Sequence, residues 1–161
     1  MASAFVLVEE NSNIPIERLI QDIQEACLDA KLTLVFGIED TDSEQNMKHC
    51  SLGITFSDQE ELGHSEQKNN IRVDVYDEPV QYQYRELEWR DDGRVYFNTL
   101  ILDEVYQNEE VTLIFLYHFL IRQPQMVIWI EEDWIYTLSD LEKILKTTIH
   151  SEWCYVNPDS I

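Results

Sequence analysis

The sequence predicts a single α+β domain, a mostly antiparallel or mixed β-sheet packed by about three helices. The order of the elements favours this class: strand and helix, then several strands, then helix, strand and helix. The chain has 161 residues, 44% of them hydrophobic, which is enough to bury a core. Neither an internal repeat nor a linker interrupts it, so we treat residues 1–161 as one acidic domain.

The N-terminal segment predicts a strand and an amphipathic helix. The apolar run 5–8 is typical of a short strand. Asn13 is a candidate N-cap, and Pro15 suits the first helical turn. Apolar residues then recur at spacings of three and four, which predicts a face turned to the sheet: Ile16, Leu19, Ile20, Ile23, Cys27 and Leu28. The opposite face is expected to meet water: Glu17, Gln21, Asp22, Gln24 and Glu25.

Three more strands are predicted before residue 76, separated by polar segments. The apolar runs 32–36 and 52–56 are typical of strands, and the segment 71–75 alternates apolar and polar residues as a half-buried strand does. The polar segments 39–50 and 57–70 are predicted to be loops.

The clearest turn signal lies between residues 82–89 and 94–102. Asp91-Asp92-Gly93 stands between these two segments, and Asp-Gly supplies the positive φ that a tight hairpin needs. The first arm does not keep one alternation, because its tyrosines lie on the opposite parity from Leu87 and Trp89. A bulge or a two-sided strand would explain this, and both interpretations stay open.

The most apolar stretch predicts a buried helix and a buried strand. Asn108 is a candidate N-cap for a helix that is apolar nearly all round as far as Ile121, which places it in the middle of the domain. Pro124 ends the helix, and the apolar run 126–130 predicts a strand buried on both faces. A capping box at 139–142 then opens a last helix, and the tail is expected to pack back onto the body.

The charge of the chain narrows the classes of partner. Asp and Glu number 32 and Lys and Arg 11, for a net charge of −21. Direct binding of nucleic acid or of an anionic membrane surface is disfavoured, because both require Lys and Arg to neutralise phosphate. A basic protein is the natural partner.

Three further features predict a cytoplasmic protein. The N-terminus carries no positive and apolar signal pattern, and no apolar run reaches transmembrane length. Cys27, Cys50 and Cys154 are an odd number without a CxxC motif, which fits a reducing compartment.

The candidate partner-binding residues are acidic side chains with aromatic residues near them in the sequence. They fall in three segments: Glu131, Glu132, Asp133 and Trp134; Glu39, Asp40, Asp42 and Glu44; and Asp77, Glu78, Tyr82 and Tyr84. Aromatic anchors supply binding energy at interfaces, while surrounding charges set encounter rate and partner choice. Simple solvation of these loops, and cross-strand packing of the tyrosines, are the structural alternatives.

Some of the same residues, and others near them, also invite chemical interpretations. The loop at Asp40 invites a calcium site, but the sixth and twelfth positions of an EF-hand loop would hold Gln45 and Ser51. His49, Cys50 and His64 match no standard zinc spacing. No nucleotide-binding glycine motif is present. We therefore expect neither a catalytic site nor a metal or cofactor.

The leading hypothesis is an inhibitor of a basic protein, most naturally a nuclease toxin. Bacterial immunity proteins have this physical character, an analogy that rests on no shared motif. A mimic of DNA that occupies a nucleic-acid-binding protein is a variant of it. The alternatives are a regulatory or assembly module, dimeric in one form, whose acidity serves solubility, and an enzyme that uses a carboxylate-bound metal. The sequence leaves the oligomeric state open.

Overall fold

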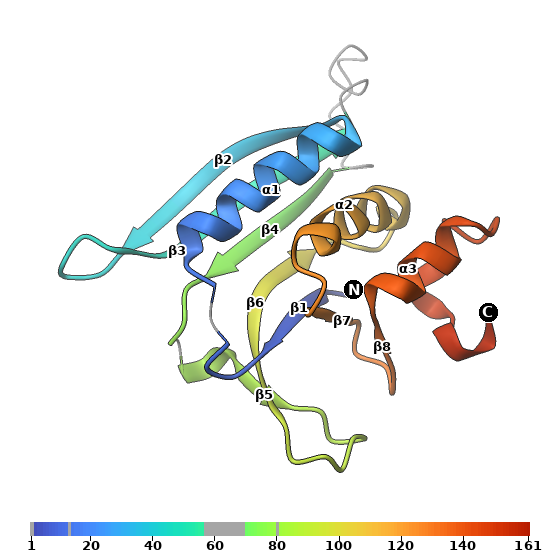
Figure 1. Ribbon diagram of the computed structural model, residues 1–161. Coiled ribbons are helices and arrows are strands. Elements are labelled where there is room, and N and C mark those ends of the chain that lie inside the picture. The colour runs from blue at the N-terminus through green and yellow to red at the C-terminus, as the bar shows by residue number, and fades with distance from the viewer. Residues whose placement is uncertain (1, 13, 57–69, 80) are drawn as a thin grey trace.

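The predicted fold class is confirmed by the computed structural model, which describes residues 2–12, 14–56, 70–79 and 81–161 (Figure 1). Within these ranges an eight-stranded antiparallel sheet is packed by three α-helices. The strands are β1 (Ala4–Glu9), β2 (Leu32–Thr41), β3 (Met47–Phe56), β4 (Asn70–Tyr76), β5 (Tyr84–Glu86), β6 (Val95–Asp103), β7 (Val127–Trp129) and β8 (Ile135–Tyr136).

The strand order is β2-β3-β4-β6-β1-β7-β8, with β5 paired to β6 off this path. Strand β1 is therefore internal and pairs with β6 on one side and β7 on the other. Strands β2 and β8 stand at the two ends of the order.

The helices α1 (Ile16–Ala30), α2 (Glu109–Arg122) and α3 (Leu138–Leu145) cover one face of the sheet (Figure 1). As predicted, α2 lies in the middle and contacts both other helices. Its N-cap residue is Asn108, but the side chain caps no helical N–H. Instead, the Asn108 side chain accepts from the N–H of Asn70 at 3.0 Å and so joins α2 to β4.

The opposite face, which we call the open face, is only partly covered. Over β1, β6 and β7 it carries a small apolar cluster centred on Leu7, Leu87 and Tyr96. Over β3 and β4 the residues alternate, so Cys50 and Val75 face the helices while their neighbours face outward. The open face thus has an apolar half and a polar half.

The predicted loop at 39–50 is wrong, because most of it belongs to β2 and β3. These strands form a long hairpin whose turn is closed by Asp42, which accepts the N–H groups of Glu44 and Asn46 at 2.9 Å each. Residues 39–46 are exposed or half-buried, so no apolar alternation marks them as strand. The predicted loop at 57–70 and the predicted cap at Asn13 lie outside the described residues, except for Asn70.

The predicted pairing of the segments on either side of Gly93 is confirmed, but the predicted tight turn is wrong, because residues 87–94 form a longer connection between β5 and β6. Strand β5 covers only 84–86, and Gly93 has φ +67°. Tyr82 belongs to a 3-10 turn before β5, whereas Leu87 and Trp89 lie after the end of β5. Neither a bulge nor a two-sided strand is needed, because the residues of opposite parity are not in one strand.

Three predictions for α1 are corrected. Asp22 was expected to face water but is fully buried, where it accepts from Gln123 Nε2 at 2.6 Å and from Arg18 Nε at 3.2 Å. Leu28 was expected on the buried face but is 77% exposed, one residue round the helix from buried Cys27. Pro15 is the N-cap residue and precedes the first turn.

The C-terminal third also differs in detail from the prediction. Strand β7 is buried on the helix side at Ile128 but only half-buried on the open face at Val127 and Trp129, because it is close to the end of the strand order. The capping box of α3 is made by Thr137 and Asp140, earlier than predicted. The tail packs onto the body as expected, with Trp153 fully buried.

Candidate partner-binding surface

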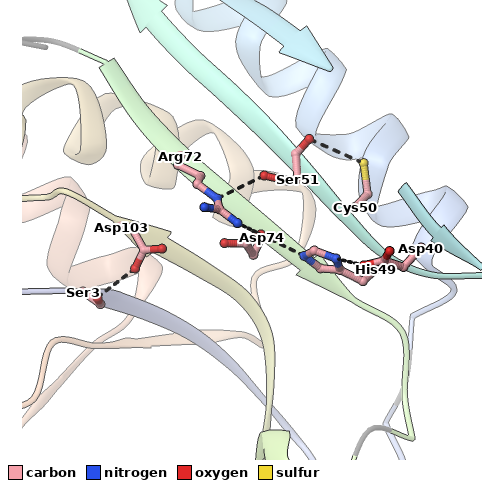
Figure 2. Close-up of polar contacts among 8 residues, drawn as sticks. All are labelled: Ser3, Asp40, His49, Cys50, Ser51, Arg72, Asp74 and Asp103. Atoms are coloured by element: carbon pink, nitrogen blue, oxygen red, sulfur yellow. Dashed lines mark hydrogen bonds and ion pairs between the residues drawn. The ribbon is translucent and has the colours of Figure 1, made fainter. Parts of the chain in front are cut away.

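Polar side chains of β2, β3 and β4 form a row on the open face (Figure 2). This polar row consists of Asp40, His49, Ser51, Arg72 and Asp74. Strand register explains the grouping, because Asp40 stands opposite His49 and Ser51 opposite Asp74. Strands β3 and β4 contribute alternate residues, and Cys50, Val73 and Val75 beside them are buried in the core.

His49 joins two carboxylates at the centre of the row. Its Nδ1 lies 2.8 Å from Asp40 Oδ2, and its Nε2 lies 2.8 Å from Asp74 Oδ1. Carboxylates only accept, so both contacts are hydrogen bonds when the ring carries both protons. The ring also stacks on Tyr76, with centroids 4.8 Å apart. His49 therefore connects β2 to β4 across β3.

Arg72 completes the polar row. It donates to Asp74 at 3.2 Å and to the Ser51 hydroxyl at 3.1 Å, and the hydrogen bond to Asp74 raises the pKa of the guanidinium. The buried Asp74 carboxylate thus contacts two side chains, those of His49 and Arg72. Since both nitrogens of His49 face carboxylates, neither is available to activate the Ser51 hydroxyl. The geometry suits rigid positioning rather than nucleophilic catalysis.

A thiol or zinc site at His49 and Cys50 does not fit the geometry. Cys50 is fully buried on the helix side, and this burial, then Glu39 and Asp74, raises the pKa of its thiol. His49 lies on the other face, and His64 lies outside the described residues. Among the residues that are described, no group of three or more His, Cys, Asp or Glu could hold a metal ion.

The acidic residues of the β2–β3 hairpin, Glu39, Asp40, Asp42 and Glu44, form what we call the acidic tip. Backbone N–H groups, that of Asn46 first, hold the pKa of Asp42 below its ordinary value. Lys48 lies 3.9 Å from Asp42 and 3.3 Å from Asp77. Within the described ranges neither Glu39 nor Glu44 forms an ion pair, and both are exposed.

The segment after β4 brings one aromatic ring to the surface beside the polar row. Tyr82 is 76% exposed and meets the edge of Tyr76, with centroids 6.5 Å apart. Glu78 and Tyr84 are used internally: Glu78 accepts from the Tyr84 hydroxyl at 2.8 Å and from the N–H of Asn11 at 3.0 Å. Of the predicted residues in this segment, Tyr82 is therefore the most accessible.

The third predicted segment lies at the other end of the sheet, in the loop between β7 and β8 (Figure 1). Glu131, Glu132 and Asp133 are exposed there. Trp134 is half-buried, and its Nε1 donates to the Tyr136 hydroxyl at 2.8 Å. The structure thus brings the acidic tip close to Asp77 but leaves this loop apart from them.

Exposed apolar side chains on β2 were not predicted. Val35 is 58% exposed, Phe36 48% and Ile38 70%. The sequence marks 32–36 as an apolar strand but does not show that this strand ends the sheet. An isolated Ile38 between Gly37 and Glu39, where the apolar run breaks, is the signal that could have found the site.

A cavity of about 440 Å³ also opens beside β1 and the β5–β6 connection, and Arg90 and Arg94 line it. Arg94 lies 3.2 Å from Glu9, and Arg90 lies 3.2 Å from Asp92. Each guanidinium is thus matched by a carboxylate, and the cavity offers no excess of positive charge to an anion.

Comparison of the chain with protein-family models, with curated proteins and with solved structures gives no match. In the described part of the chain, no helix has the length and apolar character needed to cross a bilayer.

Proposed function

We propose that this protein binds and neutralises a basic protein, most naturally a nuclease toxin, through the acidic tip and its neighbours. The observation that carries the proposal is that exposed carboxylates stand on a hairpin held in place by side-chain contacts. His49 fixes Asp40, and Lys48 lies between Asp42 and Asp77. A pre-organised charged surface loses little conformational entropy on binding.

A nuclease is the favoured partner because it must present Lys and Arg toward phosphate. A surface that replaces phosphate with carboxylates is complementary to it, and opposite charge speeds encounter. Tyr82 and the exposed apolar residues of β2 supply the contact area that charge alone does not give.

A regulatory module that forms dimers is the second candidate. The exposed apolar residues Val35, Phe36 and Ile38 favour it, since such patches often mark contacts between protein chains. The net charge of −21 on each copy opposes it.

Capture and inhibition together test the first proposal. The immobilised protein is incubated with lysates of the source strain and of neighbouring strains, and retained proteins are assayed for nuclease activity with and without the free protein. We expect a basic protein whose nuclease activity falls to background at equimolar inhibitor, with association that slows as salt rises. Retained proteins without nuclease activity, or with activity that the free protein does not reduce, would contradict it.

Two charge-reversal variants locate the surface. Glu39→Lys with Glu44→Lys changes the acidic tip, and Glu132→Lys with Asp133→Lys makes the same change of charge in the β7–β8 loop. The tip variant should slow association with the captured protein by about tenfold at low salt, and the loop variant by less than about twofold. Equal slowing would mean that net charge, rather than the tip, steers the partner.

A further inference from the structure

Strand β2 presents an unusual edge. It is ten residues long and stands at the end of the strand order, and β3 is its only partner strand in the described part of the chain. The outer edge of such a strand displays N–H and C=O groups that another chain can pair with. Natural proteins usually keep edge strands short or charged. Strand β2 is long, and its first half, residues 32–36, carries no charged side chain.

The accessible part of this edge begins at Val35. From Val35 to Thr41 every residue is exposed. Val35 stands opposite Gly53 and Phe36 opposite buried Leu52, so Val35 belongs to the open face and Phe36 to the helix face. A strand added here would find apolar side chains on both faces of the sheet.

A bulge divides this edge into an apolar and an acidic part. The register shifts between Phe36 and Glu39, and a Cβ at Gly37 would lie 2.7 Å from the carbonyl oxygen of Ser51. Only glycine allows this approach. Ile38 is 70% exposed beside the bulge, and Glu39 and Asp40 follow it.

We propose that the edge of β2 from Val35 to Thr41 binds an extended basic segment of the partner as an added β-strand. This inference rests on the proposed function, since it names the manner in which a basic partner is held. The main chain of the segment would pair with β2, its apolar side chains would pack on Val35, Phe36 and Ile38, and its Lys or Arg residues would face Glu39 and Asp40. A second copy of this chain is the poorer occupant, because it would bring a further charge of −21.

A synthetic peptide of about eight residues that alternates lysine and valine is the probe. The control peptide has the same sequence with N-methyl groups on alternate residues, which remove N–H donors while keeping charge and side chains. We expect the first peptide to bind and to slow amide hydrogen exchange in β2. N-methylation should weaken binding by about tenfold or more, since several main-chain hydrogen bonds are lost.

Two variants test the position of the site. Ile38→Arg should weaken binding of the peptide by about tenfold, because it replaces an apolar contact with a like charge. Ile121→Arg, at an apolar residue of α2 that is 45% exposed, makes the same change away from β2 and should leave binding unaltered.

The possible failures are distinct. Equal binding of the two peptides, or protection elsewhere than in β2, would overturn strand addition. Absence of peptide binding while the protein still inhibits a basic nuclease would overturn this inference and leave the proposed function standing. Peptide binding at β2 without any captured nuclease would refute the proposed function instead. A dimer that Ile38→Arg dissociates would show a second copy in place of the basic segment.

Discussion

The strands at the two ends of the sheet differ in their length and in how much of each strand is exposed to solvent. Strand β8 has two residues, and the C-terminal tail packs on its buried tyrosine: the Tyr136 hydroxyl donates to the carbonyl oxygens of Val156 at 2.9 Å and of Trp153 at 3.2 Å. Strand β2 has ten residues and is exposed from Val35 onward. We call the short end with its buried tyrosine the closed edge, and the long exposed end the open edge. A protein that binds through an edge needs this asymmetry, because two open edges would promote uncontrolled association.

The closed edge should be the more sensitive to substitution. Tyr136 is fully buried, and burial raises the pKa of its hydroxyl. Tyr136→Ala removes a core ring and leaves the Trp134 indole N–H without its acceptor, so the free energy of unfolding should fall by about 3–5 kcal/mol. Urea denaturation measures this. The control Tyr82→Ala, at a residue 76% exposed, should change stability by less than about 0.5 kcal/mol. Similar losses for both would refute the contrast.

Substitution of Gly37 at the bulge of the open edge should lower the stability of the fold by an intermediate amount. Gly37→Ala places a Cβ against the Ser51 carbonyl oxygen and should destabilise the fold by about 1–3 kcal/mol. Gly53→Ala is the matched control on the partner strand, because its Cβ would come no closer than 3.9 Å to the nearest atom outside its chain neighbours. It should be neutral or slightly stabilising, since alanine has fewer unfolded conformations. Thermal unfolding of the two variants decides, and equal midpoints would mean that the bulge relaxes freely.

Substitution of the exposed apolar residues of the open edge should have the smallest effect on the free energy of unfolding. Ile38→Thr should alter the free energy of unfolding by less than about 0.5 kcal/mol, because Ile38 is already 70% exposed. The same change at half-buried Ile135 of β8 should cost about 1 kcal/mol. If Ile38→Thr were the more damaging of the two in urea denaturation, β2 would be an internal contact rather than an open edge.

Local patterns predicted those parts of the fold that depend on local physics. Asp92-Gly93 correctly indicated that the chain reverses between two paired strands, although the connection is longer than the tight turn that this pair favours. The helix ending near Ile121 was placed centrally because its apolar residues surround it. Residues 39–50 were missed because most of their side chains reach solvent, so burial imposes no pattern there. Asp22 was misplaced because Gln123, which satisfies it, is 101 residues away.

In the candidate site, too, some features could be predicted from local sequence and others depend on long-range contacts. Composition predicted an acidic partner-binding surface; Tyr82, Glu39, Asp40 and Glu44 are exposed, and their role in binding stays a prediction. No local pattern could show that Glu78 and Tyr84 bond to each other, or that the β7–β8 loop is far from the tip along the sheet. These facts follow from strand order, which depends on long-range pairing. For the same reason Ile38 could mark an unusual apolar residue in the sequence, but the place of β2 at the end of the sheet follows only from the strand order.

The internal place of β1 has a consequence for biosynthesis. Residues 4–9 leave the ribosome before the other described strands of this sheet, yet the neighbours of β1 are β6 and β7. The β2–β3 hairpin can form from adjacent sequence while β1 waits for partners that are synthesised much later. Closure of the sheet is thus a late event in translation, and contacts of such long sequence separation slow folding.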